Sequence, residues 1–372
     1  MRKSSMAMHL DGGHRIAARL TALTLLAGLC ALAFLLSIGA GAVNLSLGEV
    51  WRALFVETSG VRRQIVFNLR LPRALAGAMV GACLAVSGVL LQAVMRNPLA
   101  SPSVIGVSSG AGFFGMLAMV LVPGNLYAVL PPAAFFGGLV TTLAIYLLAW
   151  RNGINPTRMI LAGVATSTFL RAGVDALMVF FPDQLAGFVS FSVGGLSGVT
   201  WRHVWMLLPY AAAGLFFAVL LSQRLNILLL GDEAATGLGL HVERTRLLAI
   251  AVSALLAAAA VSVAGLLSFV GLLAPHIARR LVGNNHRILL PAAMLLGTDE
   301  RYLVPGAALG GAALVMLCDT LGRVVAPPIE VPVGIILAIL GAPFFLYVLR
   351  GRSKRDVAGK TYYHQLRRKN RP

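Results

Sequence analysis

Charged side chains are scarce in this sequence. Only 12% of its 372 residues are Asp, Glu, Lys or Arg, whereas 58% are hydrophobic. A soluble domain carries about 25% charged residues, so the deficit excludes an ordinary soluble protein. Apolar runs of about 18 residues or more recur along the chain, and such runs predict membrane-spanning helices.

Cysteine is also rare. The three cysteines, Cys30, Cys83 and Cys318, lie in separate apolar segments. An odd and scattered set excludes a disulfide framework and offers no metal-ligand spacing, so these residues are predicted to fill space in the core. No His, Asp, Glu or Cys cluster resembles a catalytic centre, so we expect no metal, no cofactor and no enzyme activity.

A short motif in the tail imitates a nucleotide site. Gly359-Lys360-Thr361 matches the end of a P-loop, but the motif also requires a glycine at position 354, which is Lys354 here. ATP hydrolysis is therefore not expected from this chain.

Basic residues outnumber acidic ones, 31 to 13, and give a net charge of +18. Nine of the basic residues lie after residue 349, and most others fall between apolar segments. This distribution is typical of cytoplasmic loops that face anionic lipid, and it argues against nucleic-acid binding. The first apolar stretch, 20–43, is too long for a signal peptide and predicts an uncleaved first helix.

The apolar segments predict an all-α polytopic membrane protein with about ten helices. A partial helix near 268–283 adds to nine longer segments, at 20–43, 74–95, 104–122, 129–150, 159–181, 204–222, 247–267, 303–317 and 332–349. An even number places both termini on one side. With the termini in the cytoplasm, about 23 basic residues lie inside and about 7 outside, as the positive-inside rule requires.

One basic group opposes that orientation. The segment between the first two helices must lie outside, and only Glu49 and Glu57 balance its five arginines, Arg52, Arg62, Arg63, Arg70 and Arg73. Two interpretations remain open. The group is a docking surface for an acidic partner, or a solvated loop near lipid headgroups.

Two charged pairs have helical spacing inside apolar segments. Arg171 and Asp175 lie four residues apart in the fifth segment, and Asp319 and Arg323 repeat that spacing near the end of the ninth. Charges within a membrane indicate a functional path, but an i,i+4 pair can also neutralise itself. Both interpretations of Arg171 and Asp175 stay open. Asp175 is the best candidate for a buried coupling carboxylate.

Two internal similarities appear. At an offset of 177, Gly88 matches Gly265 and Pro98 matches Pro275, which suggests an inverted repeat. Residues 286–297, HRILLPAAMLLG, resemble 300–311, ERYLVPGAALGG, as a tandem duplication of 14 residues.

The loop at 231–239, GDEAATGLG, lies between two spans on the inner side. It suits a small helix followed by a tight bend on the membrane surface, or an ordinary polar loop. Leu238 and Leu240 are apolar, which favours burial against a partner.

Five motifs follow one another along the chain: RLPRALAGAMVGACLAVSGVLLQAVMRNPLASPSVIGVSSGAG (70–112), GDEAATGLGLHVERTRLLAI (231–250), GLLSFVGLLAPHIARRLVG (265–283), CDTLGR (318–323) and EVPVGIILAILGAPFFLYVLRGR (330–352). Together they resemble the iron-siderophore, haem and vitamin B12 permeases of ABC importers, the FecCD-type transmembrane subunits. The resemblance implies a permease domain at 20–352, preceded by a cytoplasmic segment at 1–19 and followed by a basic cytoplasmic tail at 353–372. The extra 14-residue copy departs from the family pattern.

The resemblance also implies a function and partners. It predicts a ten-helix, inverted-repeat type II importer fold that works as a homodimer in the cytoplasmic (inner) membrane. A periplasmic binding protein would deliver a ferric siderophore, or else haem or vitamin B12, and separate cytoplasmic ATP-binding subunits would drive transport. An ion-coupled secondary transporter, which also uses inverted repeats, remains as another class. A membrane enzyme is disfavoured because no His, Asp, Glu or Cys cluster gathers into a plausible site.

The site residues implied by the resemblance fall in two groups. Arg70, Arg73 and Arg323 match the arginines that contact the binding protein. The coupling helix, which sits in a groove of the ATPase, matches Asp232, Glu233, Ala234, Ala235, Gly237 and Gly239.

Overall fold

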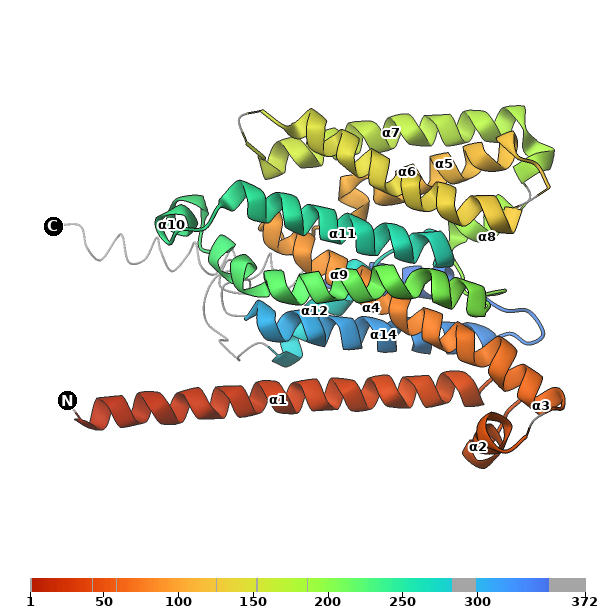
Figure 1. Ribbon diagram of the computed structural model, residues 1–372, viewed down its shortest axis with the longest axis horizontal. Helices are drawn as coiled ribbons and strands as arrows, with labels where there is room; N and C mark the ends of the chain where they lie inside the picture. The colour runs from red at the N-terminus through yellow and green to blue at the C-terminus, as the bar shows by residue number, and fades with distance from the viewer. Residues whose placement is uncertain are drawn as a thin grey trace.

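The computed structural model describes residues 2–347 except 42, 58, 125, 152, 186 and 283–298. Its described residues form a bundle of helices without a β-strand (Figure 1). The longer helices are α1 (Arg2–Gly39), α4 (Leu71–Val94), α5 (Val107–Leu121), α6 (Leu126–Ala149), α7 (Pro156–Phe180), α9 (Trp201–Leu228), α11 (Val242–Ala264), α12 (Val270–Val282), α14 (Glu300–Val324) and a last helix, Val333–Tyr347.

Short elements connect these helices. They are α2 (Leu47–Phe55), α3 (Val61–Arg63), the π-helix η1 (Gln64–Arg70), the 3-10 helices η2 (Pro102–Ile105) and η3 (Pro182–Leu185), α8 (Phe188–Val193) and α10 (Asp232–Gly237). Gly60 begins the α3–η1–α4 run with a φ of 119°, a left-handed value that suits glycine.

The predicted all-α, multi-span architecture is confirmed. Within the described part of the chain, seven helices are long and apolar enough to cross a membrane, and α5 and Val333–Tyr347 are shorter apolar helices. The partial helix expected near 268–283 is α12, which contains Pro275 and ends with Arg279 and Arg280 in its last turn.

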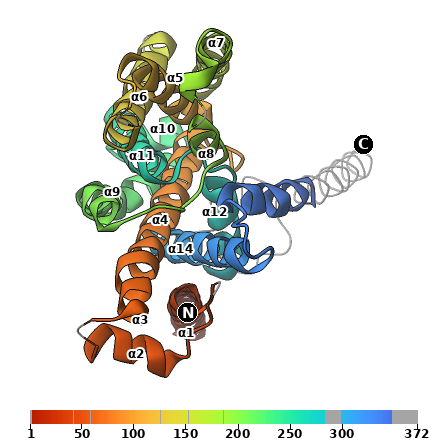
Figure 2. The same cartoon turned by 90° about the vertical axis from the view of Figure 1, so that its right-hand side faces the viewer.

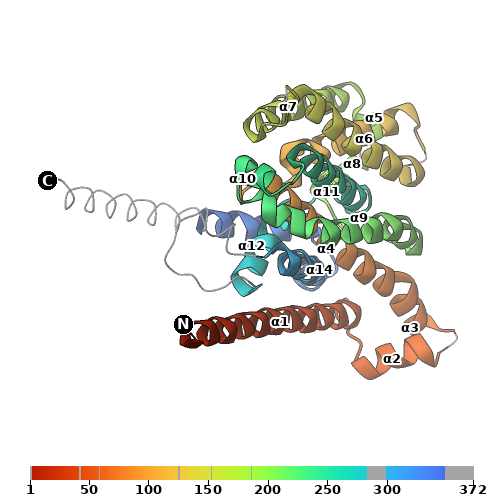
Figure 3. The ribbon, with the colours of Figure 1, turned by 60° about the vertical axis from the view of Figure 1, so that its left-hand side comes forward.

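The bundle has two distinct ends (Figure 1). The first turns of α1 and the short helix α10 lie at one end, which we call the α10 end, and α2 and α3 lie at the other, the α2 end. Helices α5, α6 and α7 gather on one side and α1 on the other, with α4 between them (Figure 3).

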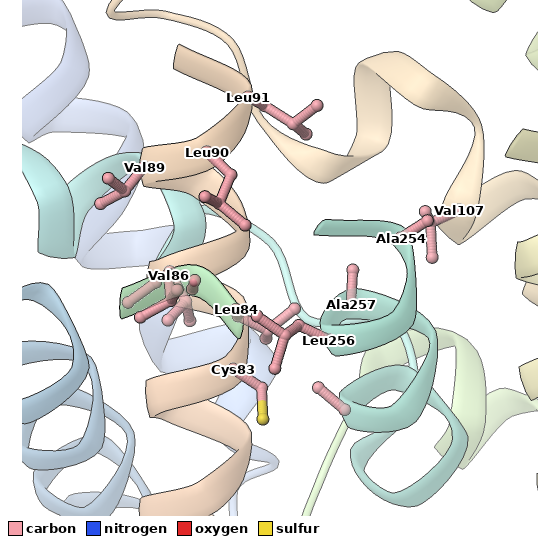
Figure 4. Packing of buried hydrophobic residues seen from close by; sticks show 14 of the residues in the cluster. Cys83, Leu84, Val86, Val89, Leu90, Leu91, Val107, Ala254, Leu256 and Ala257 are labelled. Atoms are coloured by element: carbon pink, nitrogen blue, oxygen red, sulfur yellow. The ribbon is translucent and has the colours of Figure 1, made fainter. Parts of the chain in front are cut away.

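The core forms around α4, which is the most buried of the long spans and packs against α14, α11, α9 and α12. Figure 4 shows the leucines and valines of α4 beside the small side chains of α11, including Ala254 and Ala257. A Cβ added at Gly88 would lie 1.8 Å from the carbonyl oxygen of Gly271, so glycine there lets α4 and α12 touch through their backbones. Ser87 and Ser253 join α4 to α11 by a hydrogen bond of 2.7 Å between their hydroxyls.

The residues matched by the proposed inverted repeat have different local settings. Gly88 lies inside α4, whereas Gly265 ends α11 with a φ of 70°. Pro98 follows the end of α4, whereas Pro275 lies inside α12. The correspondence therefore does not extend to the backbone conformation of these residues.

The second copy of the tandem duplication forms the first turns of α14. Asp299 caps this helix by accepting a hydrogen bond from the backbone N–H of Arg301. The first copy, 286–297, lies outside the described residues, as do the tail at 353–372 and its Gly359-Lys360-Thr361 motif.

Candidate functional site

The three arginines predicted to dock a partner come together at the α2 end. Arg70 ends η1, Arg73 lies in the first turn of α4, and Arg323 lies in the last turn of α14. Helices from opposite parts of the sequence thus bring three cations to one place. Arg70 and Arg323 are each only 7% exposed.

Two carboxylates balance this arginine cluster. Arg73 donates to both oxygens of Asp319, with contacts of 2.9 to 3.2 Å, and its Nη1 lies 2.8 Å from Glu330. Arg323 lies 3.3 Å from the same Asp319. Asp319 is buried, so its charge requires these partners.

The arginines also bind the end of α1. Arg70 donates to the carbonyl oxygens of Ile38 and Gly39 at 2.8 Å, and also to that of Val43. Arg323 donates to the carbonyl oxygens of Ser37 and Ala40 at 2.9 and 3.1 Å. The last carbonyl oxygens of a helix lack hydrogen-bond donors within the helix and carry partial negative charge. The two guanidiniums supply both the donors and the positive charge.

Glu330 is the exposed member of the cluster. It lies in the loop before the last helix and accepts a hydrogen bond of 2.8 Å from the Ser197 hydroxyl. Burial alone would raise its pKa, but hydrogen bonds from Arg73 and Ser197 outweigh burial and hold the pKa below the ordinary 4.5. Glu330 therefore stays ionised and ties α4 to two loops.

The predicted coupling segment forms a short helix at the α10 end. Gly231, with a φ of 112°, precedes α10, and Gly239 follows it with a φ of 80°. Glu233, Ala234, Gly237 and Leu238 are exposed, and Ala235 is buried against the bundle. The positive φ of Gly239 suits glycine. Gly237 is helical and has open space around its Cα, so its backbone conformation does not require glycine.

Asp232 anchors α10 to the rest of the chain. It accepts hydrogen bonds from Arg246 on α11 and from Arg96, which follows α4. Arg246 also donates to the carbonyl oxygen of Ile154 at 3.0 Å, and Glu243 accepts from the backbone N–H of Ile154 at the same distance. The first residue of α10 is thereby joined to α4, α11 and the loop before α7.

Sequence reasoning missed Arg96, Arg246 and Glu243. A weak signal existed, because Glu243 and Arg246 have i,i+3 spacing directly after the coupling motif. Burial and the charge of Arg246 both hold the pKa of Arg96 below its ordinary value.

The translocation-path candidates lie on α7, and one expectation about them is wrong. Arg171 and Asp175 are both exposed in the chain, although Asp175 was expected to be buried. Among the described residues no ion pair joins them, although their spacing allows one. The apolar sequence around Asp175 predicted its depth in the membrane, but burial depends on which face of α7 meets a neighbouring helix.

No group of three or more His, Cys, Asp or Glu residues gathers in the part of the chain that the structure describes. The arrangement at both ends of the bundle consists of ion pairs and hydrogen bonds that hold neighbouring segments in place.

Comparison with known proteins gives the family. The model of the FecCD transport family matches residues 29–299 and 294–351, in two segments that meet at the tandem duplication. The chain is 36% identical over 340 residues to the Fe(3+)-citrate import system permease protein YfmE of Bacillus subtilis, covering 91% of this chain and 97% of the relative. It is 42% identical over 292 residues to the cobalamin import system permease protein BtuC of Halobacterium salinarum, covering 78% of this chain and 74% of the relative.

A solved structure agrees with these relatives. It is described as an inward-facing conformation of a metal-chelate type ABC transporter, and it aligns with a TM-score of 0.76 at 30% identity over 88% of this chain and 98% of the other. The chain belongs to the FecCD transport family.

Proposed function

We propose that this chain is the permease subunit of an ABC importer that carries an iron chelate, most specifically a ferric siderophore, across the cytoplasmic membrane. The observation that carries the proposal is the placement of two recognition elements at opposite ends of one apolar bundle. The arginine cluster lies at the α2 end, and helix α10 lies at the opposite end (Figure 1).

The α10 end would face the cytoplasm, where ATP-binding subunits act. Helix α10 presents exposed Glu233, Ala234 and Leu238 and is held at its first residue by Arg96 and Arg246. A small element fixed at one end and exposed at its tip suits rigid-body transmission of nucleotide-driven motion. ATP hydrolysis is assigned to the separate subunits.

The α2 end would face the periplasm and receive the binding protein. Arg70, Arg73 and Arg323 outnumber Asp319 and Glu330. A positive surface suits acidic side chains on a delivering protein. The proposal has both termini in the cytoplasm.

A second copy of this chain would cover α7. This span is the least buried of the seven, and it exposes Arg171 and Asp175 beside apolar residues such as Phe169 and Val179. Charges that face hydrocarbon are costly, so a homodimer with α7 at its interface supplies the polar path that they need.

The proposed substrate class rests on how much of each relative's length aligns with this chain. The iron-citrate relative aligns over nearly its whole length, and the solved neighbour is of metal-chelate type, whereas the cobalamin relative aligns over 74% of its length. Haem or vitamin B12 remains the alternative substrate. An ion-coupled transporter would need no ATP-binding subunits, so dependence on these subunits distinguishes it from an ABC importer.

The test is reconstitution of the chain with its ATP-binding subunits and binding protein in vesicles. We expect ATP-dependent uptake of a ferric siderophore that exceeds uptake of haem and of cobalamin. Uptake driven by an ion gradient without ATP-binding subunits would refute the proposal. Preferential uptake of haem or cobalamin would refute only the substrate.

A further inference from the structure

The helix α2 has three faces of different chemistry. Val50 and Ala53 are buried against Ile38, Val66 and Ala74. A second face carries Leu47, Trp51 and Phe55, which are 63%, 63% and 68% exposed. Because residues four apart share one side of a helix, these three side chains form a continuous apolar stripe.

The third face of α2 is polar. Arg52 and Gly48 are exposed there, and Glu49 lies 3.8 Å from Arg62. A helix on a protein surface that faces water has one apolar face packed on the core and one polar face toward the solvent. The exposed apolar face between them therefore needs a further, non-aqueous contact.

The position of α2 indicates which contact this is. It lies across the direction of α1 at the edge of the bundle, since Figure 2 shows α1 end-on and α2 from the side. The membrane span of α1 runs over 23 residues, Ala17–Gly39, or about 34 Å at 1.5 Å per residue, close to the ~30 Å of a bilayer core. Helix α2 packs on Ile38, at the end of that span, and so sits at headgroup level.

The surroundings continue the same pattern. Leu35 and Leu36, in the last turns of α1, are exposed, as is Leu69 in η1. Trp201 donates its ring N–H to the carbonyl oxygen of Phe67 at 2.9 Å and stacks on the exposed Trp205. Tryptophan favours the interface between membrane and water, where its ring meets acyl chains and its N–H meets polar groups.

From these observations we propose that α2 is an interfacial helix that lies in the outer leaflet of the bilayer. Leu47, Trp51 and Phe55 enter the boundary between headgroups and acyl chains. Arg52 and Arg62 face lipid phosphates, which explains basic residues on the side of the membrane where the positive-inside rule disfavours them. The inference requires a membrane-spanning chain but no particular substrate.

The local sequence builds this helix in place. Ser46 and Glu49 form a capping box, in which the backbone N–H of Glu49 donates to the Ser46 hydroxyl and the backbone N–H of Ser46 donates to the Glu49 carboxylate. The box fixes where α2 begins and hence the face on which Trp51 lies.

Fluorescence quenching tests the proposal on the full chain in phosphatidylcholine–phosphatidylglycerol vesicles. The fluorescence of Trp51 is obtained by subtracting the emission of the Trp51→Phe variant from that of the wild-type chain. Lipids with bromine near the headgroup should quench this difference about twofold more than lipids with bromine at the chain end, because an interfacial helix is buried only about 5–10 Å. The matched control is Trp150→Phe, which removes an exposed tryptophan. Trp150 pairs with Ile154, which bonds to Arg246, the partner of Asp232 in α10, so it belongs to the end opposite α2.

Three results would overturn the proposal. The first is a Trp51 signal that aqueous iodide quenches and brominated lipid does not. The second is stronger quenching by bromine at the chain end. The third is a signal that becomes shielded only when a periplasmic binding protein is added, which would make the stripe a protein-docking face.

A second measurement needs no substitution. A phospholipid with a photoreactive group at its headgroup should label the peptide that contains residues 47–55 of the wild-type chain. Labelling of this peptide no stronger than that of the exposed α10 segment would contradict an interfacial position.

Discussion

Arg246, whose side chain is 3% exposed, donates hydrogen bonds to both carboxylate oxygens of Asp232 at 2.8 and 3.0 Å. The guanidinium is buried in the bundle, whereas the carboxylate is half exposed at the start of α10. The pair therefore joins the surface element proposed to meet the ATP-binding subunits to the helix α11 in the core.

Asp232→Asn should uncouple ATP hydrolysis from uptake. The amide keeps the size of the side chain but loses the charge that both Arg96 and Arg246 bind, and hydrogen bonds to charged groups contribute about 1.5–3 kcal/mol. We expect uptake per ATP to fall several-fold in the reconstituted complex, with thermal stability less affected because Asp232 is half exposed.

The matched control for that variant is Glu233→Gln, which removes an adjacent charge that is exposed and makes no ion pair among the described residues. If Glu233 meets the ATPase directly, this control should weaken assembly with that subunit. Unchanged uptake per ATP in Asp232→Asn would show that its ion pairs do not transmit motion.

Gly239→Val should disturb the coupling segment, whereas Gly237→Ala should not. Gly239 has a φ of 80°, and a β-branched residue held there costs on the order of 1–3 kcal/mol. Gly237 is helical with no atom within 4 Å of an added Cβ, so alanine fits without strain. The measurement is co-purification with the ATP-binding subunit followed by uptake. Equal behaviour of the two variants would show that the bend after α10 is unimportant.

The sequence predicted the spans and α10 but not what holds them together. Apolar runs and the EAA-x-x-x-G pattern are local signals, and so they located the long helices and the bend at Gly239. Arg323 also binds the carbonyl oxygens of Ser37 and Ala40, which lie 286 and 283 positions away in the sequence. Backbone carbonyls have no sequence signature, so no local pattern could show that these arginines hold the end of α1.

Deletion of Asn285–Thr298 should give a chain that inserts and transports. The deletion removes one 14-residue copy and keeps Asp299, which caps α14, and Glu300, its first residue. The two matches of the family model overlap at 294–299, within the duplicated region, and the resemblance to the family predicts a single copy there. Membrane insertion and uptake are measured beside the parent chain. Failure of the deletion variant to insert would mean that the extra copy is structurally required.

Acidification should remove the contribution of Glu330 to stability. Its folded-state pKa lies below 4.5, because the hydrogen bonds from Arg73 and Ser197 outweigh the effect of burial. A depressed carboxylate pKa contributes stability above the unfolded pKa, and this contribution is lost as pH falls through the folded value. The wild-type chain should therefore unfold at a higher temperature than Glu330→Gln at neutral pH. The difference should shrink below pH 4.5 and vanish once the pH is below the folded pKa. A difference that persists there would mean that ionisation of Glu330 is not its source.

Arg323→Glu should destabilise the permease before any partner is involved. The substitution removes donors to the carbonyl oxygens of Ser37 and Ala40 and brings a second carboxylate to the buried Asp319. Breaking a buried ion pair costs about 3–5 kcal/mol, so we expect a clear fall in the unfolding temperature of the isolated chain. Arg52→Glu makes the same change of charge on the exposed face of α2, where surface substitutions stay within about 0.5 kcal/mol. Loss of transport in Arg323→Glu therefore reports docking only if stability is unchanged. Equal unfolding temperatures in the two variants would show that Arg323 is free for a partner and does not hold α1.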